Sequence, residues 1–178
     1  TWKGTPVSVM PSGMGMPSAA IYVTELVREY GVTRLIRVGT AGVYQPDLAL
    51  RQIIAAESAV TNSNLPAMIG ATEPLTAAPA LLQAARDTAS ATGVSLLTGQ
   101  VFTSDVFYEP TNNAQERHTA AGVLCVEMEC AALYAIAALE NIEALAMFTM
   151  TDHLVTGQHL SSDERQQGVD EMIELALN

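Results

Sequence analysis

The chain has 178 residues, of which 49% are hydrophobic and only 5% aromatic, and this suits one globular domain with an aliphatic core. Its 19 acidic and 8 basic residues give a formal net charge of −11 without a cluster of Lys or Arg, so no nucleic-acid partner is expected. The longest apolar run, residues 130–139, is too short to cross a membrane, so no membrane partner is expected either.

The cysteines indicate a reducing compartment. Cys125 and Cys130 have no His at a metal-ligand spacing, and a single disulfide would be a weak framework for a chain of this size. We therefore expect buried thiols and no metal site. Because no signal peptide is recognisable, we expect the protein to be cytoplasmic.

Apolar runs alternate with amphipathic segments along the chain. Strands are expected at residues 7–10, 35–38, 53–60, 94–102, 123–126 and 144–149. Helices are expected at residues 18–30, 79–92, 129–139 and 161–177, the last with Ser161 or Ser162 as its N-cap. Residues 61–78 have no clear period and are expected to form a surface loop. Strands that alternate with helices predict an α/β fold, with residues 1–178 forming one domain around a largely buried sheet.

Glycine-rich or polar segments follow several of the predicted strands. They are residues 12–15, 37–42, 127–129 and 151–153. Ligands of open α/β sheets bind beyond the carboxyl ends of the strands, where such loops meet. We therefore expect these segments to form one site.

Arg37 ends an apolar strand and precedes the Gly/Thr segment 39–42, which is expected to break the strand. A guanidinium and backbone N–H groups together suit a phosphate or a carboxylate. The alternative is an Arg paired with a structural carboxylate. The glycines match neither a Walker loop nor a dinucleotide fingerprint.

The acidic residues of the other segments also allow two interpretations. Glu127 and Glu129 can accept hydrogen bonds from ribose hydroxyls, or Glu129 can simply favour a helix N-terminus.

Asp152 follows a strand, and Arg165 begins the last helix. An Asp in an apolar site can hold a proton for a leaving group, whereas a neighbouring Arg favours its ionised form, so the pair is either a switchable acid or a structural ion pair.

Taken in order, these segments resemble the bacterial hexameric purine nucleoside phosphorylases along nearly the whole chain. The matching motifs are residues 13–18, 36–40, 107–108, 126–129, 151–153 and 164–166. The resemblance implies the nucleoside phosphorylase fold, a three-layer domain whose mixed sheet carries helices on both faces. It also implies phosphorolysis of purine ribonucleosides or deoxyribonucleosides to the free base and the sugar 1-phosphate. A homo-oligomer, a hexamer by resemblance, is expected.

The resemblance further implies a division of roles. Phosphate would be bound by Arg37 and Thr40, ribose by Met14, Glu127, Met128 and Glu129, and the base by Phe107 and Val126. Asp152 would protonate the purine ring as the glycosidic bond breaks, and Arg165 would promote that transfer. The partners are then a purine nucleoside and inorganic phosphate, with no cofactor and no metal.

Some features depart from the family. Its N-terminal segment, with a phosphate-binding loop and arginines, is absent, so we expect an incomplete phosphate site in this chain. Val155 stands where an Arg is usual. The alternatives are an adenine-nucleoside nucleosidase of the same superfamily, against which Arg37 and Arg165 argue, and a non-catalytic nucleoside-binding or assembly subunit. A uridine phosphorylase would have little use for Asp152.

Overall fold

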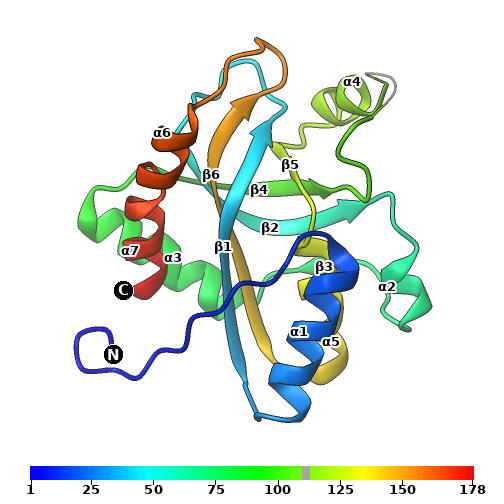
Figure 1. Cartoon of the computed structure of the whole chain (residues 1–178), viewed down its shortest axis with the longest axis vertical. Coiled ribbons are helices and arrows are strands. Elements are labelled where there is room, and N and C mark those ends of the chain that lie inside the picture. The colour runs from blue at the N-terminus through cyan, green and yellow to red at the C-terminus, as the bar shows by residue number, and fades with distance from the viewer. Residues whose placement is uncertain (110–112) are drawn as a thin grey trace.

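A six-stranded mixed sheet organises the part of the chain that the structure, a computed structural model, describes, namely residues 1–109 and 113–178 (Figure 1). The strands are β1 Arg34–Val43, β2 Ile53–Thr61, β3 Leu75–Thr76, β4 Leu96–Thr103, β5 Cys125–Glu127 and β6 Glu143–His153. Their order is β3-β2-β4-β5-β1-β6, and β2 also pairs with β6, so all strands except β3 close into a ring. The pairs β1–β6, β2–β4 and β4–β5 are parallel, and the others are antiparallel.

Helices cover both faces of this sheet. They are α1 Met16–Arg28, α2 Leu65–Met68, α3 Pro79–Thr92, α4 Asn113–Ala120, α5 Cys130–Glu140, α6 Ser162–Gln167 and α7 Asp170–Leu177. Helices α1 and α5 lie together on one side, and α3, α6 and α7 lie on the other (Figure 1). The predicted three-layer α/β fold is therefore confirmed. No helix in the described residues is long and apolar enough to span a membrane.

Local signals fix several helix ends as predicted. Helix α3 begins at Pro79 and ends before Gly93, whose φ of 77° is the left-handed conformation that glycine adopts most easily. Helix α6 begins with a capping box, in which the Ser161 side chain accepts from the Glu164 backbone and the Glu164 side chain accepts from the Ser161 backbone. Both N-termini follow from the sequence alone.

Tertiary contacts correct other predictions. The strand expected at residues 7–10 is wrong, because this exposed segment pairs with no strand in the described part of the chain. The break expected at residues 39–42 is also wrong, since β1 continues to Val43 in parallel with β6, and β6 likewise continues to His153. The predicted helix 161–177 is two helices that separate at Gly168, and the expected loop 61–78 contains α2 and β3. Helix α4, which is polar, was not predicted.

The Tyr134 hydroxyl connects β2 and β6 where their direct pairing ends. That pairing runs from Ile53 to Ala55 on β2. At the next position the hydroxyl donates to the Ala56 carbonyl at 2.6 Å and accepts from the Ala146 N–H at 3.0 Å. Because Ala146 is also the β6 partner of Arg37, this buried side chain supports the strand segment that carries the candidate site.

Candidate functional site

Arg37 lies along β1 because Gly39 has no side chain. A Cβ at Gly39 would collide with the guanidinium of Arg37. On the neighbouring strand, the Phe148 ring lies 5.2 Å from the guanidinium carbon, which is within the range of a cation–π contact. The Arg37 side chain is only 16% exposed, so its charge needs partners within the protein or in a ligand.

Carboxylates supply part of that need. Arg37 Nη2 donates to Glu129 Oε2, and Nη1 lies 4.0 Å from Glu127 Oε2. Among the described residues, Nε and Nη1 of Arg37 are buried without a hydrogen-bond partner. The guanidinium is therefore partly paired, and it retains donors for a further acceptor.

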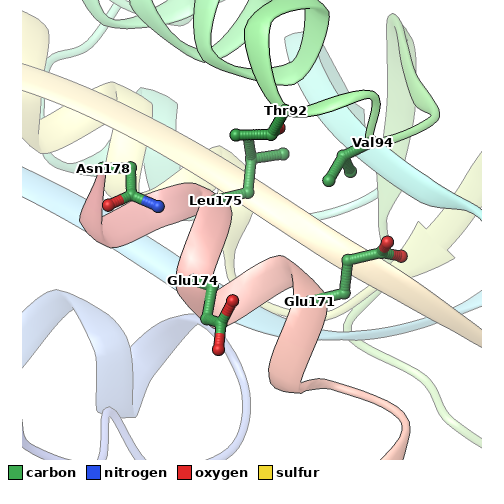
Figure 2. A pocket seen from close by; sticks show the side chains of 6 residues that line it. All are labelled: Thr92, Val94, Glu171, Glu174, Leu175 and Asn178. Carbon is green, nitrogen blue, oxygen red and sulfur yellow. The ribbon is translucent and has the colours of Figure 1, made fainter.

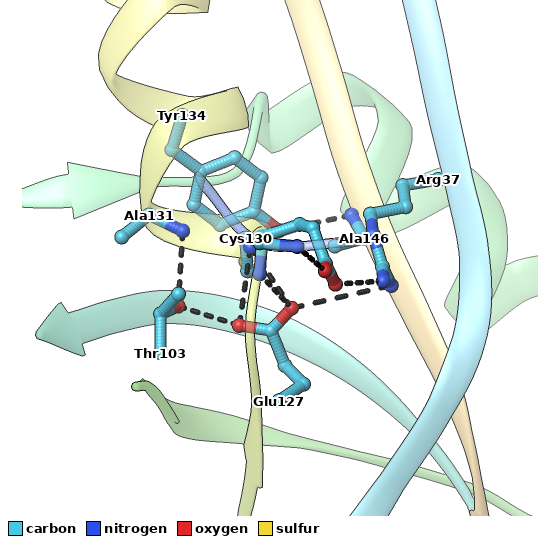
Figure 3. A network of polar contacts seen from close by, with 9 residues as sticks. Arg37, Thr103, Glu127, Cys130, Ala131, Tyr134 and Ala146 are labelled. Carbon is cyan, nitrogen blue, oxygen red and sulfur yellow. Dashed lines mark hydrogen bonds and ion pairs between the residues drawn. The ribbon is translucent and has the colours of Figure 1, made fainter. Parts of the chain in front are cut away.

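Glu127 faces inward and caps helix α5 (Figure 3). Its carboxylate accepts from the N–H groups of Glu129 at 2.8 Å and Cys130 at 2.9 Å, and from the Thr103 hydroxyl at 2.5 Å. Burial raises the pKa of Glu127, while Arg37 and the Thr103 hydrogen bond oppose that rise. Because the Glu127 side chain is only 1% exposed, we expect it to hold the start of α5 in place and not to contact a ligand.

Glu129 connects the N-termini of two helices. It is the N-cap residue of α5, and its Oε1 accepts from the Gly15 N–H at 2.5 Å, where Gly15 is the N-cap residue of α1. Gly15 has a φ of 83°, a conformation that favours glycine. Because helix N-termini attract negative charge, this corner of the fold suits anions and polar oxygen-rich groups.

The acid and the arginine predicted to assist it are also in contact. Arg165 Nη2 donates to Asp152 Oδ1 at 2.7 Å, and the Thr151 hydroxyl donates to Asp152 Oδ2 at 2.8 Å. The Asp152 side chain is 36% exposed, so a ligand can reach it. Asp152 lies within β6 and not after it.

Gly42 brings Asp152 close to the other segments. It pairs with Asp152 of β6 on one side and with Val126 of β5 on the other. Gly39, over which the Arg37 guanidinium lies, is about 10 Å away along the strand. The side chains of Arg37, Glu127 and Glu129 and the residue Asp152 are therefore arranged along β1 between Arg37 and Val43.

The remaining predicted residues are more dispersed. Met14 and Phe107 are exposed, at 77% and 73%, and Met128 is half-buried. Thr40 is exposed, and because side chains alternate along a strand, it leaves β1 on the face opposite to Arg37. No hydrogen bond joins Thr40 to Arg37 within the described residues.

Thr103 is a site residue that the sequence analysis missed. It ends β4, is fully buried, and contacts both Glu127 and the first turn of α5. A signal was available, because Thr103 directly follows the predicted strand 94–102. The rule that selected the other segments would have selected it too.

A separate pocket of about 370 Å³ lies between α3 and α7 (Figure 2). It is lined by Thr92, Val94, Glu171, Glu174, Leu175 and Asn178. The carboxylates of Glu171 and Glu174 would repel an anion such as phosphate. In the described part of the chain, no group of three or more His, Cys, Asp and Glu side chains could hold a metal ion. The pocket between α3 and α7 therefore does not suit a phosphate.

Comparison with known proteins places the sequence in a family. The sequence pattern of the family described as Phosphorylase superfamily matches residues 1–177. A purine nucleoside phosphorylase DeoD-type from Geobacillus kaustophilus (strain HTA426) is 46% identical over 99% of this chain and 75% of its own length. Proteins of the same description are 46% identical in Clostridium perfringens (strain ATCC 13124) and 44% identical in Bacillus cereus (strain B4264), over 100% of this chain and 77% of their own lengths.

Proposed function

Because the chain belongs to the phosphorylase superfamily, we propose that it cleaves purine ribonucleosides or deoxyribonucleosides with inorganic phosphate. The products are the free base and the sugar 1-phosphate. The observation that carries this proposal is the arrangement along β1, where a partly unpaired Arg37 and its partner Glu129 lie on the same strand system as the Asp152–Arg165 pair.

Phosphate binds at Arg37 in this proposal. The unpaired Nε and Nη1 donors can each form a charge-assisted hydrogen bond to a phosphate oxygen. Thr40 is the second proposed ligand. Strand β5 pairs with β1 only at Gly42 and Val43 in the described residues, so it leaves the Thr40 segment uncovered. Because the Thr40 side chain leaves β1 on the face opposite to Arg37, Thr40 would bind the same anion through its backbone in this proposal.

Ribose binds at Glu129. A carboxylate has about four lone-pair positions, so Glu129 can keep the Gly15 N–H and Arg37 as donors and still accept from vicinal hydroxyls. Met128 and the exposed Met14 supply apolar contact to the sugar in this scheme. Glu127 acts from behind by fixing the segment that carries Glu129.

The base binds beside Asp152. Val126, opposite Asp152 across Gly42, and Phe107 provide apolar contact to the purine. A phosphate oxygen attacks the anomeric carbon, the bond to the base nitrogen breaks, and its electron pair moves into the purine. Asp152 donates a proton to the purine ring nitrogen, because an unprotonated purine anion leaves poorly. Thr151 and Arg165 hold the carboxyl group in place for that transfer.

The assay that tests this function measures base release from inosine and from adenosine at increasing phosphate. Release that depends on phosphate and saturates is expected. Equal release without phosphate would instead identify a nucleosidase, and the free Arg37 donors argue for an anionic acceptor over water. Nucleoside binding without release would identify a non-catalytic binding subunit.

We also propose that the protein is a cytoplasmic homo-oligomer. Ile21 of α1 and Ile36 and Val38 of β1 are exposed apolar side chains that a second copy can cover. Cys125 and Cys130 are free thiols, as a reducing compartment maintains. Analytical ultracentrifugation tests the assembly, and a monomer at micromolar concentration would contradict it. Cell fractionation tests the location.

A further inference from the structure

We propose that Thr103 is a positioning residue for phosphorolysis, because its hydroxyl holds the Glu127 carboxylate and the first turn of α5 together and so places Glu129 and Arg37. The inference rests on the proposed function. Thr103 touches neither reactant in this scheme, and it acts through its contacts with the residues that do.

The Thr103 hydroxyl uses both of its hydrogen-bonding capacities (Figure 3). It donates to Glu127 Oε1 at 2.5 Å and accepts from the Ala131 N–H at 3.0 Å. The side chain is fully buried, so water cannot replace these contacts from bulk solvent. The strand register brings the two residues together, since Thr103 of β4 pairs with Glu127 of β5.

Thr103 of β4 and Glu127 of β5 together cap helix α5, so the acceptors come from neighbouring strands and not from the helix itself. The N–H groups of Glu129 and Cys130 bond to the Glu127 carboxylate, and the N–H of Ala131 bonds to Thr103. The N-cap residue Glu129 makes no side-chain cap of its own. Because neighbouring strands satisfy these N–H groups, the Glu129 carboxylate is free to reach Gly15 and Arg37.

Loss of the Thr103 hydroxyl would disturb the arrangement in which Thr103 and Glu127 bind the N–H groups of α5 while Glu129 binds Gly15 and Arg37. The Ala131 N–H would be buried without an acceptor, next to the N–H groups that the Glu127 carboxylate already binds. A carboxylate drawn toward the helix would leave Arg37 and the ribose position. Binding of both phosphate and nucleoside should therefore weaken, while the chemistry at Asp152, on β6, should change less.

The test compares Thr103→Val, which keeps the shape without the hydroxyl, with Thr103→Ser, which keeps the hydroxyl. Thr98→Val is the matched control, because Thr98 lies on the same strand and donates to Glu57 at 2.8 Å, outside the site. We expect Thr103→Val to raise the KM for phosphate and for inosine about tenfold, in line with loss of a hydrogen bond to a charged group. Thr103→Ser and Thr98→Val should stay within about twofold of the unmodified protein, and kcat should fall less than KM rises.

The pH profile separates positioning from a general loss of stability. The groups facing Glu127 are Arg37, Glu129, Cys125, Cys130 and Tyr134, and burial raises the pKa of both thiols and of the phenol, so they stay neutral. Removing the Thr103 donor raises the pKa of Glu127 further, so ionised Glu127 is lost at a higher pH. The acid limb of kcat/KM should shift upward in Thr103→Val and return in Thr103→Ser.

A second variant and a binding measurement complete the test. Thr103→Cys, with a weaker donor, should fall between Ser and Val, and it replaces Val if that variant does not fold. Calorimetric binding of inosine follows the same order without turnover. The proposal is overturned if the hydroxyl-free variants match Thr98→Val in KM, binding and pH profile. An unmodified protein that binds inosine but shows no phosphate-dependent cleavage contradicts the proposed function instead, and the binding series then still decides the role of Thr103.

Discussion

Substituting Gly39 with Ala should displace Arg37 while leaving the fold intact. The new Cβ would collide with the guanidinium, which is the far end of a flexible side chain and can move aside. Replacing Gly by Ala in an allowed conformation stabilises a protein by about 0.4–1 kcal/mol through the unfolded chain, which offsets part of the lost contact with Glu129. The free energy of unfolding should therefore change by no more than about 1–2 kcal/mol.

The effect on phosphate should be much larger. A hydrogen bond between charged groups contributes about 1.5–3 kcal/mol, so a displaced guanidinium should raise the phosphate KM by about 10- to 150-fold. Steady-state phosphorolysis of inosine at varied phosphate measures this constant, and urea unfolding measures the stability. The KM for inosine should rise less, because Glu129 keeps its contact with Gly15.

Gly99→Ala is the matched control. Gly99 also lies in a strand, and its Cβ would meet the end of the Leu124 side chain, away from Arg37. It should leave the phosphate KM unchanged. If Gly39→Ala binds phosphate as well as Gly99→Ala does, the position of the Arg37 guanidinium does not determine phosphate affinity, and our account of the anion site is refuted.

Two further predictions concern the acid and the thiols. Asp152→Asn should lower kcat for adenosine by about 10²- to 10⁴-fold with little change in nucleoside binding. It should lower kcat much less for a nucleoside with a good leaving group. Equal losses on both substrates would contradict the acid role. Cys125 and Cys130 are buried, and burial raises the pKa of both thiols well above the ordinary value. A thiol reagent at pH 8 should therefore label them only after unfolding. Rapid labelling of the folded protein would contradict their burial.

Local signals in the sequence were sufficient for much of the fold. Helix α3 begins at Pro79 and ends before Gly93, and Ser161 caps α6. These ends were predictable because each residue acts through its own backbone or side chain. The ends of β1 and β6 were not predictable in this way. Residues 39–42 of β1 are small or polar, and pairing with β6 and, at Gly42, with β5 keeps them in a strand although both partners are distant in sequence.

In the candidate site, too, some features follow from the local sequence and others depend on distant contacts. The rule that ligands meet at strand ends selected Arg37, Glu129 and Asp152, and the structure arranges them along β1 between Arg37 and Val43. The sequence left open whether Arg37 pairs with a structural carboxylate or binds an anion. The structure shows the pairing with Glu129 and also leaves donors free. The position of Thr103 after a predicted strand could have been noticed, but its contact with Glu127 depends on the register between β4 and β5.

In the proposed reaction inorganic phosphate, and not water, captures the sugar. Phosphorus NMR of the protein with inosine and phosphate detects the sugar product itself. We expect a new sugar phosphate signal that grows in step with released hypoxanthine. Hypoxanthine released with free ribose, while the phosphate signal stays unchanged, would contradict it.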